Sequence, residues 1–414
     1  MKAIILAAGS GKRMKSELPK VLFKVAGKPL LHCVIDTCLE AGIDDITVVV
    51  GKSGEKVREA TDHAVQFAWQ KEQLGTGHAV ICAKDHIDPD DSVVVLAGDA
   101  PLVTPDLLKN LMKFQQDKKV HGVVVSTLVP DPTGYGRVIT TPSGGFEAIV
   151  EHRDLAPEQM DVKDINPSVY VFTGRELLRG LELIDNNNSQ KEYYLTDVPK
   201  MMKQEGFKVA VYHDSDYLQF LGINSQKQLS EAAAVLRSRI IDKHFDNGVT
   251  IIDPNTTYID ADVEIGPGTV IKPCTVIEKS KIGSNCQIGP FAYIREDTVV
   301  GDRCRIGDFV ELKKSTLGDD TKAAHLAYIG DAEIGNRVNF GCGAITVNYD
   351  SKLKNKTIVE DGAFVGSNVN LVAPITVGAG AYVAAGSTVV DDVPSEALAI
   401  ARQRQVHKEG WAKK

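Results

Sequence analysis

Hydrophobic and polar positions follow a strand-and-helix alternation from the start of the chain to about residue 226. Four apolar runs are typical of strands buried on both faces, and they lie at residues 4–8, 45–50, 92–99 and 122–127. Three stretches have apolar residues at helical spacing, and they lie at residues 30–42, 75–85 and 105–116. This alternation predicts an α/β domain with a mostly parallel sheet, covering helices, and ligands beyond the carboxyl ends of the strands.

A long helix is predicted over residues 225–247, where the chain has neither Gly nor Pro. Leu229, Ala233, Leu236 and Ile240 recur there at helical spacing. We interpret this segment as a helical connection between two domains.

From about residue 248 the hydrophobic period changes to six. Aliphatic residues recur in six-residue steps with occasional five-residue steps, and glycine often follows them, as at Gly283, Gly307 and Gly366. The series consists of Ile259, Ile265, Ile271, Ile277, Ile282, Ile288, Ile294, Val300, Ile306, Leu312, Leu317, Ala323, Ile329, Ile334, Val359, Val365, Leu371, Val377, Val383 and Val389. Such a pattern predicts a parallel β-helix, in which three hexapeptides form one triangular coil and successive coils stack at about 4.8 Å.

The six-residue pattern is predicted to break between Thr346 and Thr357, where the sequence TVNYDSKLKNKT contains three lysines. This segment is expected to leave the β-helix as a loop, which is either functional or a tolerated surface insertion. In a regular part of the series, Cys286 and Cys304 are 18 residues apart. They are expected on adjacent coils as reduced thiols rather than as a disulfide.

The composition narrows the class of protein. The net charge of −8 argues against a general nucleic-acid binder, and no apolar run reaches the roughly 18 residues of a membrane span. The first residues enter a strand pattern directly, without the pattern of a signal peptide. Seven scattered cysteines, with no C-x-x-C pair or His/Cys cluster, fit a reducing cytoplasm and predict no zinc site. We therefore expect a cytoplasmic protein without nucleic-acid or membrane partners.

The loop after the first apolar run has the residues of a phosphate site. Its sequence, AGSGKRMKSELPK, contains two glycines whose bare backbone can approach phosphate oxygens, and it contains several cations. A Walker A loop would need a glycine at Leu6, and a dinucleotide fingerprint would need one at Met14. The loop therefore belongs to neither class, and a glycine turn with solvated cations remains the alternative.

Two further segments favour a nucleotide site. Gln70 lies in a polar loop before a helix whose first turn holds Gly75 and Thr76, and the amides of this loop suit a base edge. Asp99 ends a buried strand, where a carboxylate suits Mg²⁺ beside phosphate oxygens. The alternative for Asp99 is a cap on the following helix.

Many short stretches match one family. They are LAAGSGKRM, LPKVL, EQLGTGHA, GDAPL, DPTGYGRV, IVEH, EYYLTD, GIN, GDFVELKK, AHLAYIGDAEIG, ITVNYD, VGSN, LVAP and KEGW. On these stretches the whole chain resembles the bifunctional bacterial N-acetylglucosamine-1-phosphate uridyltransferases/glucosamine-1-phosphate N-acetyltransferases. The resemblance implies an α/β fold, with a Rossmann-like nucleotidyltransferase domain followed by a left-handed β-helix of hexapeptide repeats.

For the first half, the resemblance implies uridylyl transfer from UTP to N-acetylglucosamine-1-phosphate. Arg13 and Lys20 would act on the phosphates as catalytic residues, and Asp99 and Asn224 would hold Mg²⁺. The implied nucleotide-binding residues are Leu6, Ala7, Ala8, Gly9, Gln70, Gly75, Thr76, Gly98 and Asp99. The implied sugar-binding residues are Gly136, Glu151 and Asn166.

For the second half, the resemblance implies acetyl transfer from acetyl-CoA to the amine of glucosamine-1-phosphate. His325 would be the general base, a role that neutral imidazole suits near pH 7, whereas a structural hydrogen-bonding role is the alternative. The implied sugar-phosphate residues are Arg295, Lys313, Tyr328, Asn339 and Lys354. The implied acetyl-CoA residues are Asn348, Tyr349, Ser367, Ala385 and Arg402.

The predicted domains are a nucleotidyltransferase domain at 1–224, a helical linker at 225–247, an acetyltransferase β-helix at 248–395 and a basic tail at 396–414. The resemblance also implies a homotrimer, with acetyltransferase sites between neighbouring prisms. The basic tail suits the anionic nucleotide end of coenzyme A, and a solvated terminus is the alternative.

The chain departs from the family pattern at two places. Asn166 is followed by Pro167 and Ser168, where the family usually has glycine two residues after the asparagine, so the exact sugar preference stays open. The β-helix between Ile277 and Ile294 is expected to be about one coil shorter than usual.

Two other functions remain as alternatives. One is a nucleotidyltransferase alone, making another nucleotide sugar, with the β-helix as an oligomerisation scaffold. The other is a non-catalytic sensor of sugar nucleotides.

Overall fold

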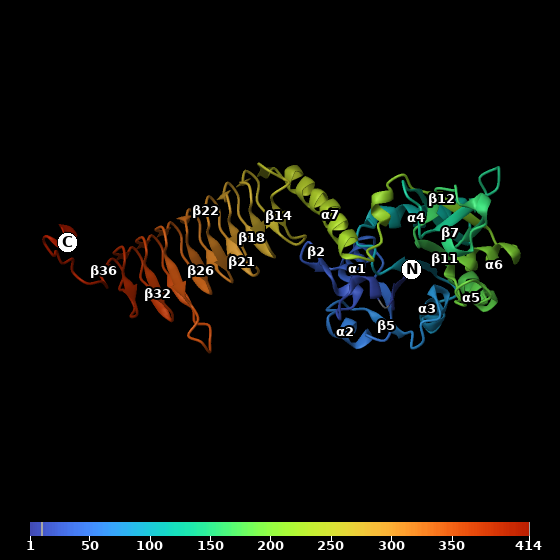
Figure 1. Cartoon of the computed structure of the whole chain (residues 1–414), viewed down its shortest axis with the longest axis horizontal. Helices are drawn as coiled ribbons and strands as arrows, with labels where there is room; N and C mark the ends of the chain where they lie inside the picture. Colours follow the sequence, from blue (N-terminus) through green and yellow to red (C-terminus); the bar gives the residue numbers. More distant parts are fainter. Residues whose placement is uncertain (10, 414) are drawn as a thin grey trace. The chain divides into compact units, whose positions relative to one another are not determined.

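The computed structural model describes residues 1–9 and 11–413 of the chain (Figure 1). These residues form two compact units, and the division lies between Leu236 and Arg237. This division falls within the helix α7, Gln226–Asp246. The presence of α7 confirms the long helix predicted for this segment. The predicted domain limits at residues 224, 247 and 395 stay predictions.

The first unit is built on a ten-stranded sheet in the order β5-β4-β1-β6-β11-β7-β10-β8-β9, with β12 beside β7. The strands are β1 Lys2–Ala7, β4 Asp45–Val50, β5 Gln66–Trp69, β6 Ser92–Ala97, β7 Gly122–Leu128, β8 Gly136–Thr140, β9 Phe146–Val150, β10 Asp164–Asn166, β11 Tyr170–Thr173 and β12 Val209–His213. The four predicted strands β1, β4, β6 and β7 all run in one direction, as the alternation predicts. However, β11 lies antiparallel between β6 and β7, so the sheet is mixed.

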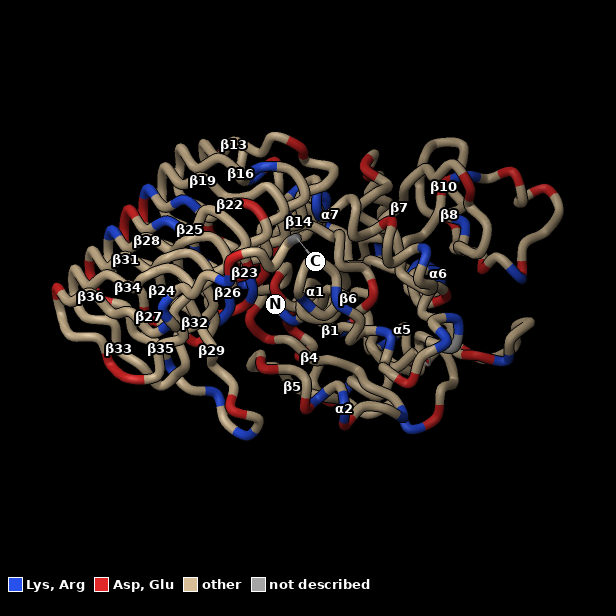
Figure 2. Tube along the Cα trace, turned by 60° about the vertical axis from the view of Figure 1, so that its left-hand side comes forward, with Lys and Arg blue, Asp and Glu red and all other residues tan. Residues whose placement is uncertain are grey.

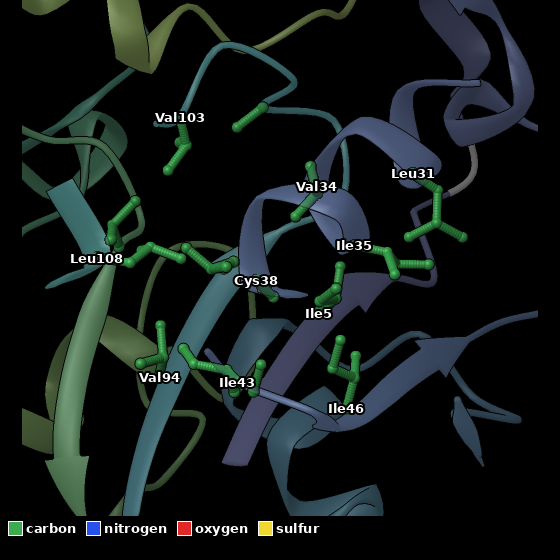
Figure 3. Close-up of a cluster of buried hydrophobic side chains, with 14 of the residues drawn as sticks. Ile5, Leu31, Val34, Ile35, Cys38, Ile43, Ile46, Val94, Val103 and Leu108 are labelled. Atoms are coloured by element: carbon green, nitrogen blue, oxygen red, sulfur yellow. The ribbon is translucent and has the colours of Figure 1, made fainter. Parts of the chain in front are cut away.

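Both faces of this sheet are covered. The helices are α1 Leu30–Glu40, α2 Gly54–Glu59, α3 Thr76–Cys82, α4 Pro105–Lys118, α5 Gly174–Leu183 and α6 Val198–Gln204, and a small hairpin is formed by β2 Lys24–Val25 and β3 Lys28–Pro29. Ile5 of β1 belongs to the hydrophobic cluster under α1 and α4, whereas its neighbour Ile4 belongs to the cluster on the opposite face. Burying a side chain of this size contributes about 1.5–3 kcal/mol. Figure 3 shows Ile5 between Ile35 and Ile46 in the first cluster.

Helix α1 is amphipathic in the way its sequence predicts. Leu31, Val34, Ile35 and Cys38 point into the core (Figure 3), and the helix ends before Gly42, whose φ of 85° is in the left-handed region. The opposite side of the helix is therefore left for polar side chains.

The second unit is a β-helix with three faces, as predicted. The first face consists of β13 Thr250–Ile251, β16 Val270–Ile271, β19 Gln287–Ile288, β22 Arg305–Asp308, β25 Lys322–His325, β28 Asn339–Phe340, β31 Phe364–Val365, β34 Tyr382–Val383 and β36 Leu398–Ala399. The second consists of β14 Tyr258–Ile259, β17 Val276–Ile277, β20 Tyr293–Ile294, β23 Glu311–Lys313, β26 Tyr328–Gly330, β29 Ile345–Val347, β32 Asn370–Val372 and β35 Thr388–Val389. The third consists of β15 Glu264–Ile265, β18 Ser280–Ile282, β21 Thr298–Val300, β24 Thr316–Leu317, β27 Ala332–Ile334, β30 Thr357–Val359 and β33 Ile375–Val377.

The predicted inward series is buried throughout, from Ile259 to Val389. The predicted break, Thr346 to Thr357, is wrong at both ends. Phe340 and Thr346 continue the six-residue series inside the prism, and Thr357 is buried in β30. Thr346 was missed because it is polar, but its hydroxyl accepts from the Gly330 N–H at 2.8 Å and is satisfied in the core. The loop therefore comprises residues 348–356 and projects from the coils (Figure 1).

One edge of the prism carries a ladder of Asp and Asn side chains. The side chains of Asp302, Asp319, Asn336 and Asp361 each accept a backbone N–H from the preceding coil, at 2.8–2.9 Å. Charged positions recur from coil to coil along the prism (Figure 2). Each coil thus ties its turn to the next one by the same bond.

Cys286 and Cys304 lie on adjacent coils, as predicted, because Gln287 pairs with Arg305 in the next strand. All seven cysteines are free thiols. Among the described residues, no helix is both long and apolar enough to cross a bilayer.

Candidate active sites

In the first unit, residues from three distant segments meet at one ammonium group. The side chain of Lys20 forms an ion pair with Asp99 and lies 3.0 Å from Asn224 Oδ1. The Lys20 and Asp99 side chains are only 14% and 15% exposed. The structure therefore brings together the two oxygens predicted to hold a metal ion, together with a cation predicted to act on phosphate.

The backbone beside this group comes from two neighbouring strand ends. Strands β1 and β6 are parallel neighbours, and the Gly98 N–H donates to the Leu6 carbonyl at 2.9 Å. Ala7, Ala8 and Gly9 line a cavity of about 280 Å³, together with Gln73, which donates to the Ala8 carbonyl. Sequence reasoning named the strand ends correctly because parallel neighbours end at one edge of a sheet.

Arg13 lies on the short 3₁₀ turn Lys12–Met14 and its side chain is exposed. Among the described residues, no hydrogen bond or ion pair joins Arg13 to Lys20, Asp99 or Asn224. Its role on the phosphates stays a prediction.

Tyr135 was not predicted as a site residue, although it lies in the motif DPTGYGRV. Burial raises the pKa of its phenol, and the nearby charge of Asp99 raises it further. Tyr135 therefore stays a neutral hydroxyl close to the Asp99 carboxylate.

Gln70, Gly75 and Thr76 lie together at the start of α3. The Gln70 amide donates to the Gly75 carbonyl at 2.9 Å, and the Thr76 hydroxyl accepts the Leu195 N–H at 3.1 Å. Gly75 has φ 109°, and a side chain there would collide with the Tyr193 carbonyl. The glycine is thus needed for a close backbone approach.

The three predicted sugar residues are also brought together. Gly136 pairs with Asn166 across β8 and β10, and a Cβ on Gly136 would lie 3.7 Å from the Glu151 carboxyl carbon. Burial raises the pKa of Glu151, whereas a hydrogen bond from Thr196, at 3.0 Å, lowers it. Glu151 also lines a cavity of about 400 Å³.

The departure at Pro167-Ser168 keeps the backbone conformation that glycine favours. Ser168 has φ 62°, in the left-handed region, and its N–H donates to the Asn166 side-chain oxygen at 3.2 Å. The Asn166 amide also contacts the Tyr170 hydroxyl. The substitution therefore leaves Asn166 oriented by its own turn and by a buried phenol.

In the second unit, His325 is paired with an aspartate on the preceding coil. The His325 Nδ1 atom lies 2.7 Å from Asp308 Oδ1, and the two residues are register partners of β22 and β25. This hydrogen bond holds the pKa of Asp308 below its ordinary value. With the Nδ1 proton donated to Asp308, the Nε2 lone pair of His325 is directed to solvent, since the side chain is 53% exposed.

Asp308 was quoted in the motif GDFVELKK but was not named as a site residue. The signal that could have found it is the spacing, because residues 17 apart lie on adjacent coils. A close approach of these coils is possible because Gly307 lacks a side chain, which would collide with the Ala324 carbonyl.

Three cations, Arg295, Lys313 and Lys354, lie close together on the β-helix unit. Repulsion from the Lys354 ammonium, together with that of Arg295, lowers the pKa of Lys313. Tyr328 lies near the Lys354 ammonium, and its phenol oxygen accepts the Asn348 amide at 3.3 Å. Lys354 is on the projecting loop, whereas Arg295 and Lys313 follow β20 and end β23. Arg295 also pairs with Glu311 at 3.0 Å, and the positive charge that Lys313 and Lys354 add beside it is suited to a phosphate group.

Two of the predicted coenzyme residues, Ser367 and Ala385, follow the same edge of the prism as His325. Backbone bonds link Leu326 to Asp308, Gly343 to Leu326, Asn368 to Cys342 and Gly386 to Ser367. His325, Ser367 and Ala385 therefore lie along the same edge, and Arg402 lies on the next pass of the chain, where its side chain would be 3.6 Å from a Cβ on Gly386.

Asn348 and Tyr349 begin the projecting loop. Asn348 donates to Asp331 Oδ2 at 2.5 Å, and the Tyr349 phenol donates to the Ser351 carbonyl at 2.8 Å. Asn339 lies on β28, on the same face of the prism as His325, although a different face from Tyr328.

Comparisons with known proteins cover both units. Residues 3–162 match the MobA-like NTP transferase domain family, and residues 279–314 match the bacterial transferase hexapeptide family with six repeats. Across the whole chain, the bifunctional protein GlmU of Clostridium botulinum (strain Loch Maree / Type A3) is 48% identical and that of Clostridium tetani is 46% identical, with 100% of this chain and 98% of each relative covered. The protein of the same name from Clostridioides difficile is 46% identical, with 97% of it covered.

These alignments span 448 positions, whereas this chain has 414 residues. The relatives therefore contain internal residues without a counterpart here. The expectation that the β-helix is the shortened part stays a prediction.

Proposed function

The chain belongs to the family of the bifunctional GlmU proteins, and from this premise we propose that it catalyses two steps of UDP-N-acetylglucosamine synthesis. The second unit transfers acetyl from acetyl-CoA to glucosamine-1-phosphate. The first unit then transfers uridylyl from UTP to the resulting N-acetylglucosamine-1-phosphate. The observations that carry the two-step proposal are the His325–Asp308 pair and the group of three cations on the same unit, because an oligomerisation scaffold has no need of a base and an anion site.

In the acetyl step, the amine nitrogen of the sugar attacks the thioester carbonyl. A C–N bond forms, the C–S bond breaks, and His325 Nε2 takes the proton that the nitrogen loses. Coenzyme A leaves as a thiolate, which takes a proton from the His325 imidazolium and so returns the histidine to its neutral form. Asp308 fixes the tautomer of His325 and stabilises the imidazolium, while Arg295, Lys313 and Lys354 hold the sugar phosphate.

In the uridylyl step, a phosphate oxygen of N-acetylglucosamine-1-phosphate attacks the α-phosphorus of UTP. A P–O bond forms, the bond to the β-phosphate breaks, and pyrophosphate leaves in line. The protein has to position the reactants and to spread negative charge over Lys20, Arg13 and backbone amides of the loop that contains Gly9.

Asp99 and Asn224 are suited to Mg²⁺, since a carboxylate and an amide oxygen converge on the Lys20 ammonium and both are hard oxygen ligands. These two residues would hold the ion, which would supply further positive charge beside the triphosphate. Lys20 itself neutralises the Asp99 carboxylate, donates to the Asn224 amide oxygen and is available to a phosphate group.

One assay separates this proposal from its alternatives. Glucosamine-1-phosphate, acetyl-CoA, UTP and Mg²⁺ are supplied together, and UDP-N-acetylglucosamine, pyrophosphate and free thiol are measured. Both pyrophosphate and thiol are expected. Pyrophosphate release with N-acetylglucosamine-1-phosphate, combined with no thiol release with glucosamine-1-phosphate, would favour a nucleotidyltransferase on a scaffold. If neither pyrophosphate nor thiol is formed, the result would favour a sensor.

A homotrimer and a cytoplasmic location complete the proposal. Flat triangular faces are readily paired by threefold symmetry, and the free thiols of the described residues fit a reducing compartment. Sedimentation of the full chain tests the trimer.

A further inference from the structure

A cluster of four titratable side chains lies on the side of α1 that faces away from the core. His32 and Asp36 are one turn apart on α1, whereas Asp62 and His63 lie in the segment between α2 and β5. We refer to these four residues as the two-histidine cluster. None of them belongs to the sites described above, and the sequence did not predict their proximity.

Within this cluster, Asp36 fixes the ring of His63. The His63 Nε2 atom lies 2.9 Å from Asp36 Oδ1, and Lys28 donates to the other oxygen of Asp36 at 2.8 Å. Although burial opposes it, these two bonds hold the pKa of Asp36 below its ordinary value. Because the anionic Asp36 accepts the Nε2 proton, the lone pair of His63 is on Nδ1.

That lone pair faces a second carboxylate. The His63 Nδ1 atom is 3.1 Å from Asp62 Oδ1, but the two atoms are not aligned for a hydrogen bond, and Nδ1 is buried without a partner. His32 Nδ1 lies 3.8 Å from the same oxygen, and His32 Nε2 is likewise buried without a partner. The His63 Nδ1 lone pair and the Asp62 carboxylate thus face each other as electron-pair donors beside the His32 ring, an arrangement that a cation would stabilise.

The donor spacing fits a first-row metal ion. One ligand atom from each of His32, Asp62 and His63 lies within 4.8 Å of the others. Ligand atoms around tetrahedral zinc are about 3.3 Å apart at bond lengths of roughly 2.0–2.1 Å. The Asp62 oxygen is already 3.1 and 3.8 Å from the Nδ1 atoms of His63 and His32, so the largest remaining separation is between the two rings, and a small rotation of the His32 ring would close it.

We propose that His32, Asp62 and His63 bind a divalent first-row metal ion such as Zn²⁺, with Asp36 as the positioning residue for His63. Two imidazoles and a carboxylate are a donor set for zinc rather than for magnesium, which prefers oxygen ligands and water. The carboxylate–histidine–metal arrangement of Asp36 and His63 is the usual support of a zinc ligand. A water molecule completes four-coordination.

The two-histidine cluster differs from the site at Asp99 in the ligand atoms that it offers to a metal ion. Asp99 and Asn224 offer only oxygens, and the two-histidine cluster offers two nitrogens and one oxygen. The bound ion would cross-link α1 to the segment after α2. Since only the folded chain offers this geometry, the ion is expected to raise the unfolding midpoint of the first unit.

The test uses the full-length protein, stripped with EDTA and dialysed, and titrated with Zn²⁺ by calorimetry. The wild type is expected to bind one ion per chain at this site. Asp62→Ala removes an exposed ligand without disturbing the core, and it is expected to weaken binding by about 10-fold or more. His86→Ala is the matched control, because His86 bonds only to Gln66 in this region, and it is expected to bind as the wild type does.

A second readout identifies the ligands independently of affinity. Co²⁺ in a four-coordinate nitrogen and oxygen site gives visible absorption bands, which are expected in the wild type and His86→Ala and lost in Asp62→Ala and in His63→Ala. Circular dichroism checks that each variant is folded. If His63→Ala does not fold, Asp62→Ala alone decides the test. The proposal is overturned if the wild type binds no Zn²⁺, or if Asp62→Ala binds Zn²⁺ as tightly and absorbs as strongly with Co²⁺ as His86→Ala.

Discussion

The two units assemble their sites in opposite ways. In the first unit, Lys20 reaches Asp99 and Asn224, which are 79 and 204 residues away in the sequence. In the β-helix, Asp308 and His325 are 17 residues apart, which is one coil. In the stacked prism, residues one coil apart in the sequence become spatial neighbours. In the mixed sheet, residues become neighbours through the packing of segments that are far apart in the sequence.

This difference decides what each unit tolerates. A substitution in the β-helix affects the coils above and below it, since each coil contacts only its neighbours. A substitution at the sheet edge of the first unit alters a meeting point of three separate segments. The predictions below use this contrast, and they run from the largest expected effect to the smallest.

His325→Ala is expected to lower acetyl transfer by about 10²–10⁴-fold, since it removes the general base. Pyrophosphate release from UTP and N-acetylglucosamine-1-phosphate is expected to stay at the wild-type rate. Both rates are measured on one preparation, with Lys322→Ala, an exposed residue of the same strand, as the control. Loss of both reactions in a folded protein would contradict the independence of the two units.

Asp99→Ala tests the converse. It removes a carboxylate from the Lys20 group, and we expect uridylyl transfer to fall by about 10²–10³-fold. Thiol release from acetyl-CoA is expected to be unchanged. Asp106→Ala, at the exposed start of α4, is the control, and an equal loss in both variants would remove Asp99 from the site.

Asp308→Asn tests the one-coil interval. The amide can no longer accept the Nδ1 proton as an anion, so acetyl transfer is expected to fall by about 10–100-fold with its pH profile shifted. The effect is expected in kcat rather than in KM for the sugar. Asp320→Asn removes a comparable exposed aspartate that pairs with Arg303, and it should leave the pH profile of the reaction unaltered. An unchanged profile in Asp308→Asn would mean that Asp308 does not orient His325.

Glu151→Gln addresses the cost of burying a charge in the first unit. Burial raises the pKa of Glu151 in the folded protein, so its ionisation lowers stability as pH rises through that pKa. The variant is expected to have a higher unfolding midpoint than the wild type at pH 8, and the difference should vanish in acid, where Glu151 is protonated. Thermal unfolding at several pH values measures it, and Glu147→Gln, exposed on β9, is the control. A difference that persists in acid would point to a cause other than charge.

Ser168→Gly is expected to have the smallest effect. Glycine relieves the left-handed φ but loses more chain entropy on folding, so stability should change by less than about 1 kcal/mol. KM for the sugar phosphate is expected to stay the same, since the backbone around Asn166 is retained. Ser168→Val is expected to be clearly destabilising at this φ, and a large shift in KM with Ser168→Gly would show that the serine side chain itself takes part in sugar binding.

The sequence predicted the β-helix almost residue by residue, because its inward positions repeat and need no knowledge of distant contacts. It missed Phe340 and Thr346 because one is aromatic and the other polar, whereas the prism requires only that the position be filled and satisfied. Asp308 was not predicted because it is 17 residues from His325 in the sequence and becomes its neighbour only through the stacking of coils.

In the first unit, the sequence predicted the strand ends that carry Gly9 and Asp99, because glycine and carboxylate after apolar runs are local signals. It did not predict the antiparallel β11 or the approach of Tyr135 to Asp99, since both depend on which strands become neighbours. The proximity of His32 and His63, on which the proposed metal site rests, went unpredicted for the same reason. His32 and His63 are 31 residues apart in the sequence and meet only through the packing of α1 against the segment after α2.

The ladder of Asp302, Asp319, Asn336 and Asp361 has an evolutionary consequence. Since each of these turns presents a side-chain oxygen to the preceding turn and a backbone N–H to the following one, the two ends left by excising one of them still match. A gene can therefore lose or duplicate such a turn in one event and still encode a continuous prism. A comparable deletion in the mixed sheet would remove neighbours with which strands such as β11 pair. Natural length variants of this protein are expected to differ by whole turns.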